Sequence, residues 1–179
     1  TGIKVMTNGD VLCHRDNGAV SSTYRQFVGI GGWSLASTAE VYNVTIGQTF
    51  RAVPGDTFNT AAQVVMGVFN NVVAGVPTSP ETQCIYVIKN TAAPLAAAAT
   101  LTQDIGGASA GVIVDQIPWE PVAGGRQDHI NYNFYAGLTT DRVYYADGIN
   151  CPMYYDPIQH VVVPIFTSYN EMLDVSSHV

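Results

Sequence analysis

Short runs of strand-forming residues, separated by turn residues at an even spacing, constrain the fold of this chain most. In the last third, such runs occupy residues 131–135, 142–146, 153–155 and 160–165, with Asp147-Gly148-Ile149-Asn150 as one of the turns. This spacing is typical of consecutive antiparallel strands in a β-sandwich or in a propeller blade. We therefore expect an all-β, mainly antiparallel fold: a sandwich or a partial β-propeller-like meander.

The earlier part of the chain carries the same signals. Thr7-Asn8-Gly9 separates two short apolar runs, and Asn-Gly between such runs is a strong hairpin signal. Asp16-Asn17-Gly18 and Pro54-Gly55-Asp56 are further turns by their chemistry. The strands expected around these turns cover residues 3–6, 10–13, 24–30, 40–46, 49–53, 83–89 and 111–117.

One segment, residues 60–76, carries two conflicting patterns. Ala61, Val65, Met66, Phe69 and Val73 fall at helical spacing. The abundance of valine favours a strand instead, because β-branched side chains suit pleated sheets. We favour one short helix near residues 60–75.

We treat the chain as a single β-rich domain, residues 1–179, with a division into two sub-parts, 1–120 and 121–179, as the alternative. Residues 91–110 are rich in Ala, Thr and Gly, and Asp104 is their only charged residue. Such a segment is either an ordered loop packed on a neighbour or a mobile arm. We expect it to contact a neighbouring protein.

Charged residues are scarce, at 12% of the chain against roughly 25% in an average domain. A free monomer normally covers its surface with charge. The scarcity indicates that companions cover much of the surface, or that the surface is made of uncharged polar residues. We expect contacts with other proteins.

The net charge of −7, without any run of basic residues, argues against direct nucleic-acid binding. No apolar stretch is long enough to span a bilayer, so we expect no membrane contact. Cys13, Cys84 and Cys151 are far apart in the sequence. We expect three buried thiols rather than a disulfide framework.

Catalytic and metal-binding motifs are weak. The four histidines form no metal-ligand spacing, and Cys13 and His14 are adjacent, so on a strand they point to opposite faces. Asp10 and Asp16 lack calcium-loop spacing and are better explained as turn residues. The residues 29–33 (Gly-Ile-Gly-Gly-Trp) lack the lysine of a phosphate-binding loop. Asp141, Asp147 and Asp156 could form a glycosidase pair, but the last two are better explained by turns. We expect no enzyme activity, no cofactor and no metal.

A motif in the last third resembles a known family. Residues 133–137 read Asn-Phe-Tyr-Ala-Gly, residues 141–150 read Asp-Arg-Val-Tyr-Tyr-Ala-Asp-Gly-Ile-Asn, and residues 154–156 read Tyr-Tyr-Asp. This is similar to a blade motif in the β-rich tail hub, adaptor and nozzle proteins of short-tailed bacteriophages. The first 120 residues carry no such motif. The residues that the resemblance marks as structural or interface positions are Phe134, Tyr135, Arg142, Tyr144, Asp147, Gly148, Tyr154, Tyr155 and Asp156.

The resemblance implies a virion component, assembled in the host cytoplasm, that forms part of a symmetric tail or neck. It implies a homo-oligomeric ring that contacts other virion structural proteins. It also implies that residues 176–179 run into a further strand, so that the chain is a piece of a longer protein. Two alternatives stay open. One is a capsid decoration or cement protein. The other is a carbohydrate-binding module of a tail tip that uses Trp33, Trp119 and the tyrosine clusters as sugar platforms.

Overall fold

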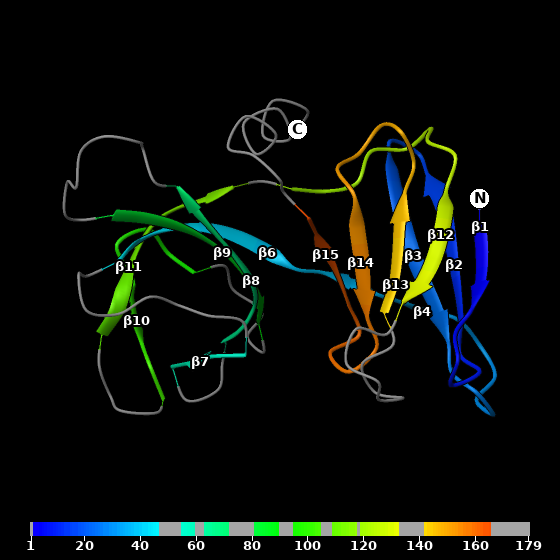
Figure 1. Ribbon diagram of the computed structural model, residues 1–179, viewed down its shortest axis with the longest axis horizontal. Coiled ribbons are helices and arrows are strands. Elements are labelled where there is room, and N and C mark those ends of the chain that lie inside the picture. The colour runs from blue at the N-terminus through cyan, green and yellow to red at the C-terminus, as the bar shows by residue number, and fades with distance from the viewer. Residues whose placement is uncertain are drawn as a thin grey trace. The chain divides into compact units, whose positions relative to one another are not determined.

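A computed structural model describes residues 2–46, 55–59, 63–71, 81–89, 95–104, 109–117, 119–132 and 142–165. The described residues are all-β and mainly antiparallel, as the sequence predicts (Figure 1). The strands are β1 (Gly2–Val5), β2 (Val11–Asn17), β3 (Val20–Gln26), β4 (Ser34–Leu35), β5 (Ser37–Thr38), β6 (Glu40–Ile46), β7 (Thr57–Phe58), β8 (Gln63–Asn71), β9 (Glu81–Lys89), β10 (Thr100–Thr102), β11 (Ser109–Ile117), β12 (Asp128–Tyr132), β13 (Arg142–Ala146), β14 (Met153–Asp156) and β15 (Val161–Pro164).

The chain divides into two compact units. Unit 1 contains Thr1–Thr38 together with Glu120–Val179, and unit 2 contains Ala39–Trp119. The boundary after Trp119 lies next to the division after residue 120 that the sequence suggests. The structure adds a second boundary after Thr38, because the first strands belong with the C-terminal ones.

Unit 1 is a sandwich of two sheets. Sheet A has the order β1-β2-β3-β4, and sheet B has the order β12-β13-β14-β15-β5. The chain passes from one sheet to the other at Ala36, because β4 pairs with β3 while β5 pairs in parallel with β15. The predicted hairpin turns are present, and Gly9, Gly18 and Gly148 take positive φ there. Glycine adopts this backbone region without the steric penalty of a side chain.

The alternation along the strands sets the two faces of sheet A. Leu12, His14, Thr23 and Arg25 are buried and face sheet B. Because successive strand residues point to opposite faces, Cys13 and Tyr24 lie on the outer face. The inner face is therefore unusually polar for a sandwich core, and its polar groups need partners from the other sheet.

Unit 2 is one antiparallel sheet with the order β10-β11-β6-β9-β8-β7. Its two edge strands approach each other at an isolated bridge between Phe58 and Gln103. Two backbone hydrogen bonds flank this bridge, from Asn59 N–H to Thr102 and from Asp104 N–H to Thr57. The curled sheet encloses a cluster of buried side chains, namely Tyr42, Val44, Phe58, Val65, Leu101 and Ile113.

The expected helix near residues 60–75 is wrong for the described residues 63–71, which form β8. This strand pairs with β9 along its length and carries a register shift between Val65 and Gly67. Residues 63–71 form a strand rather than a helix because their valines favour a strand. Gly67 would also destabilise the interior of a helix by about 1 kcal/mol. Pairing with β9 satisfies the backbone that the helix would have satisfied locally.

Smaller differences concern element bounds. The strand expected at 24–30 is β3, which ends at Gln26, and the residues after it form a loop. His160 lies in the turn before β15 with a positive φ. The expected strand at 49–53 lies outside the described residues. Cys13 and Cys151 are free and partly exposed rather than fully buried.

Within residues 91–110, the described part packs in its own unit. Leu95 and Ala99 lie against the buried cluster of unit 2, and Leu101 is part of that cluster. β10 pairs with β11 at the edge of the sheet. Whether a neighbouring protein also contacts the segment stays a prediction.

Candidate functional site

Four of the motif residues converge on the outer face of sheet B. An ion pair joins Arg142 Nη2 and Asp156 Oδ2 at 3.3 Å, and the Arg142 guanidinium lies 4.5 Å from the ring centroid of Tyr154. The rings of Tyr144 and Tyr154 are 5.8 Å apart. They are direct cross-strand partners on β13 and β14, which is the contact that stabilises such sheets. Burial raises the pKa of Tyr154 to about 12, so its phenol stays protonated.

The two motif aspartates, Asp147 and Asp156, stabilise turns through hydrogen bonds. Asp147 Oδ1 accepts hydrogen bonds from the N–H groups of Ile149 and Asn150, and its Oδ2 accepts from Gln127 and Asn150 side chains. Asp156 Oδ1 accepts from the N–H groups of Ile158 and Gln159. Both carboxylates are therefore engaged as turn residues, as the sequence predicts.

The other marked residues are placed differently. Gly148 occupies the turn after Asp147 with a φ of 77°. Tyr155 points to the opposite face of sheet B from Tyr154 and is fully buried between the sheets. Phe134 and Tyr135 lie outside the described residues.

A first buried polar cluster joins the two sheets of unit 1 through Arg25. Its side chain forms an ion pair with Asp10 and donates to the Tyr155 hydroxyl at 3.0 Å. It also contacts His160 Nδ1 and lies 3.7 Å from the centroid of the Phe27 ring. Burial alone would raise the pKa of Asp10, but hydrogen bonds from Val28 N–H, Arg25 and Asn8 lower it. The cluster is thus a buried charge pair with many hydrogen bonds.

A second buried cluster is centred on His14, which is 1% exposed. The Thr23 hydroxyl lies 2.9 Å from His14 Nδ1 and 3.3 Å from the Tyr145 hydroxyl. The centroid of the His14 ring lies 4.3 Å from that of Tyr145 and 4.8 Å from that of His129, with both ring pairs tilted. Burial, followed by the nearby His129, lowers the pKa of His14 to about 3. Burial likewise lowers the pKa of His129.

Neither cluster resembles a catalytic or metal centre. Within the described ranges, no three His, Cys, Asp or Glu side chains gather to hold a metal ion. The Nε2 atoms of His14 and His129 are buried and unbonded. Asp10 is occupied by Arg25, and Asp16 accepts a hydrogen bond from Gly124 N–H at 3.2 Å. The geometry of both clusters therefore supports a structural role, fastening sheet A to sheet B.

The outer face of sheet A carries an apolar row. Ile3 pairs with Cys13, Cys13 with Tyr24, and Tyr24 with Leu35, so the four side chains lie in one line across all four strands. Ile3 is 66% exposed and Leu35 is 64% exposed. The loop after β3 adds three exposed apolar side chains, Val28, Ile30 and Trp33. We call Ile3, Cys13, Tyr24 and Leu35 the outer row.

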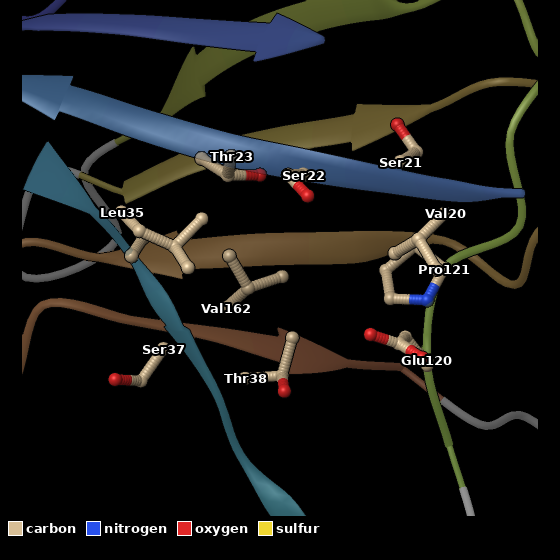
Figure 2. Close-up of a pocket in the computed structure, with 11 residues that line it drawn as sticks. Val20, Ser21, Ser22, Thr23, Leu35, Ser37, Thr38, Glu120, Pro121 and Val162 are labelled. Atoms are coloured by element: carbon tan, nitrogen blue, oxygen red, sulfur yellow. The ribbon is translucent and has the colours of Figure 1, made fainter. Parts of the chain in front are cut away.

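A pocket of about 300 Å³ lies in unit 1 where β3, β4 and β5 meet β15. Figure 2 shows Val162 in its middle and Leu35 beside it, with Ser22 to one side and Thr38 to the other, while the Ser37 side chain points away. Glu120 and Pro121 form the remaining end. Thr38 is the last residue of unit 1 before the chain enters unit 2, and Glu120 is the first residue after the chain returns to unit 1.

Sequence reasoning missed Arg25, Asp10, His14 and His129 as a set. Arg25 and Thr23, which join the two clusters to sheet B, bind Tyr155 and Tyr145 more than a hundred residues away. A faint signal exists, because His14, Thr23 and Arg25 occupy inward positions of otherwise alternating strands. A polar residue at such a position needs a partner, although the sequence does not say which.

No helix long and apolar enough to cross a bilayer occurs in the part of the chain that the structure describes. Comparison with known proteins gives no further identification: no protein-family model, curated protein or solved structure matches this chain.

Proposed function

We propose that this chain is a non-enzymatic structural component of a bacteriophage virion, forming part of a symmetric tail or neck assembly. The observation that carries the assembly part of the proposal is the outer row on sheet A. Monomeric soluble proteins rarely expose contiguous apolar surface, and such surface usually marks an interaction site. The row crosses all four strands of sheet A and contains no charged side chain.

Three further observations support a scaffold role. The chain is poor in charge, at 12% of residues. Its polar core groups bind one another rather than converging on a cavity. Four motif residues contact one another on sheet B, as expected in a rigid building block, namely Arg142, Tyr144, Tyr154 and Asp156. The virion assignment itself rests on the resemblance of residues 133–156 to phage tail proteins.

Native mass spectrometry of the purified chain over a range of concentrations tests the assembly. We expect the wild type to form a closed oligomer of one size, because a ring repeats a single interface until it closes. The double variant Ile3→Lys/Leu35→Lys should be monomeric, since it places charge at both ends of the outer row. Ile158→Lys is the matched control, because Ile158 is 55% exposed in a turn away from the row.

A wild-type chain that stays monomeric at every concentration would contradict the proposal. So would an oligomer that survives the double variant but is lost in Ile158→Lys. Electron microscopy of the oligomer then separates a ring, expected for a tail or neck component, from an open or shell-like array.

A further inference from the structure

The pocket of Figure 2 has a composition that points to a ligand. Its floor is apolar: Val162 is 1% exposed, and Ala36 and Pro121 are also buried. Ser22 of β3 and Thr38 of β5 line the pocket beside this floor, and Thr38 is the direct strand partner of Val162. The Ser37 side chain points to the opposite face of β5. An apolar floor with a few convergent polar groups is the usual make-up of a small-molecule site.

Charge narrows the class of ligand. Among the described residues, no Lys, Arg or His lines the pocket, and Glu120 contributes the only carboxylate. An anionic ligand would meet no cation and would be repelled by Glu120. Hydroxyl groups both donate and accept hydrogen bonds, so they match a ligand that carries several hydroxyls of its own.

The volume of the pocket restricts the class of ligand further. About 300 Å³ lies at the lower end of the range for ligand pockets. It has room for one pyranose ring, whose C–H face would lie against Pro121 and Val162, with its hydroxyls toward Ser22, Thr38 and Glu120. We propose that this pocket binds one neutral sugar unit of a glycan.

The site is distinct from aromatic platforms. Trp33 and Trp119 do not line the pocket. Without an aromatic stacking partner, a single sugar unit should bind weakly, with a Kd on the order of 1 mM. The inference does not rest on the proposed virion role, because it concerns the isolated chain.

Two-dimensional NMR titration of the full chain with neutral methyl glycosides, namely those of glucose, galactose, mannose and N-acetylglucosamine, tests the site. We expect at least one of them to shift resonances of residues 20–23, 35–38, 120–121 and 162. Thr38→Tyr should weaken binding by about 10-fold or more, since Thr38 is the strand partner of Val162 and the added ring occupies the pocket. Thr100→Tyr is the matched control on the exposed edge of unit 2 and should change the Kd by less than about 2-fold.

Glu120→Gln keeps the size of the side chain and should weaken binding by several-fold through loss of a charge-assisted acceptor. The spectrum of each variant reports whether it is folded. The inference is overturned if no neutral glycoside shifts the pocket resonances, if shifts occur only around Trp33 or Trp119, or if Thr38→Tyr binds as well as wild type. Native mass spectrometry of Thr38→Tyr keeps this result separate from the assembly, because Thr38 is not part of the outer row and blocking the pocket should leave the oligomer intact.

Discussion

The imidazole rings of His14 and His129 lie against each other between the two sheets of unit 1, with 4.8 Å between their centroids and 31° between their planes. His14 comes from β2 of sheet A and His129 from β12 of sheet B. Each ring keeps a buried Nε2 atom without a hydrogen-bond partner. Protonation of either ring would bury an unpaired charge, and protonation of both would place like charges side by side. The contact is therefore stable only while both rings are neutral.

This arrangement predicts a loss of stability in mild acid. The pKa of His14 is about 3 in the folded chain, against about 6.5 when unfolded. Between these values the unfolded chain takes up a proton that the folded chain does not, so the free energy of unfolding falls as the pH falls below about 6.5. The largest possible slope for one such histidine is about 1.4 kcal/mol per pH unit. Urea unfolding at pH 7.5, 6.5, 5.5 and 4.5 measures it.

The variant His14→Leu isolates this contribution, because other groups titrate in the same range. We expect the difference in unfolding free energy between wild type and His14→Leu to change with pH, with the variant losing less stability in acid. Equal losses in the two proteins between pH 6.5 and 4.5 would show that His14 is protonated in the folded chain or exposed to water.

Replacing only one partner of the Asp10–Arg25 ion pair should strongly lower the free energy of unfolding. Arg25→Met leaves the Asp10 carboxylate buried without its cation, and such changes cost about 3–5 kcal/mol. It also removes the hydrogen bond to Tyr155 between the sheets. Urea unfolding at pH 7 measures the loss.

The double variant Asp10→Asn/Arg25→Met completes the comparison. Asparagine keeps an acceptor for Val28 N–H but carries no charge. We expect the double variant to be more stable than Arg25→Met alone, because the unpaired charge is gone. If the two are equally destabilised, the loss comes from packing around Arg25 rather than from its charge.

A structural feature can be predicted from this sequence when the residues that determine it are neighbours in the chain. It cannot when those residues are far apart in the chain. The hairpin turns at Gly9, Gly18 and Gly148 are decided by a few neighbouring residues, and all three were predicted. The strand at 63–71 was not, because helical spacing and valine content disagree locally. Pairing with β9 decides the matter, and local sequence does not contain that information.

The same reasoning explains the candidate sites. Arg142, Tyr144, Tyr154 and Asp156 were predictable as a group because two adjacent strands carry them. Arg25 and Tyr155 are separated by 130 residues, so only the folded chain brings them together. The pocket was not foreseen either, since serines and threonines in strands give no sequence signal for a shared cavity.

Asp156 should contribute through two separable interactions. Its Oδ1 atom caps the turn before β15, and its Oδ2 atom pairs with Arg142. Asp156→Ala removes both and should cost about 1–3 kcal/mol, as expected for buried hydrogen-bonded groups. Asp156→Asn keeps the turn acceptor and should cost less. Thermal unfolding of both variants tests this, and an Asn variant as unstable as the Ala variant would assign the whole effect to the ion pair.

Leu101 should be a strong determinant of unit 2 stability. It is 1% exposed within the buried cluster that includes Tyr42, Phe58 and Ile113. Leu101→Ala leaves a cavity there and should cost about 2–5 kcal/mol. Since each unit has its own buried residues, we expect the damage to stay within unit 2. Hydrogen exchange followed by mass spectrometry should show faster exchange in β6, β10 and β11, with β2 and β3 unchanged.

The reciprocal variant is Leu12→Ala, because Leu12 is fully buried in unit 1. It should accelerate exchange in β2 and β3 and leave β6 and β11 protected. Partial unfolding of this kind follows when compact regions open as separate cooperative units. If either variant accelerates exchange in both units equally, the chain unfolds as one cooperative body, and the two units of the fold are not independent in stability.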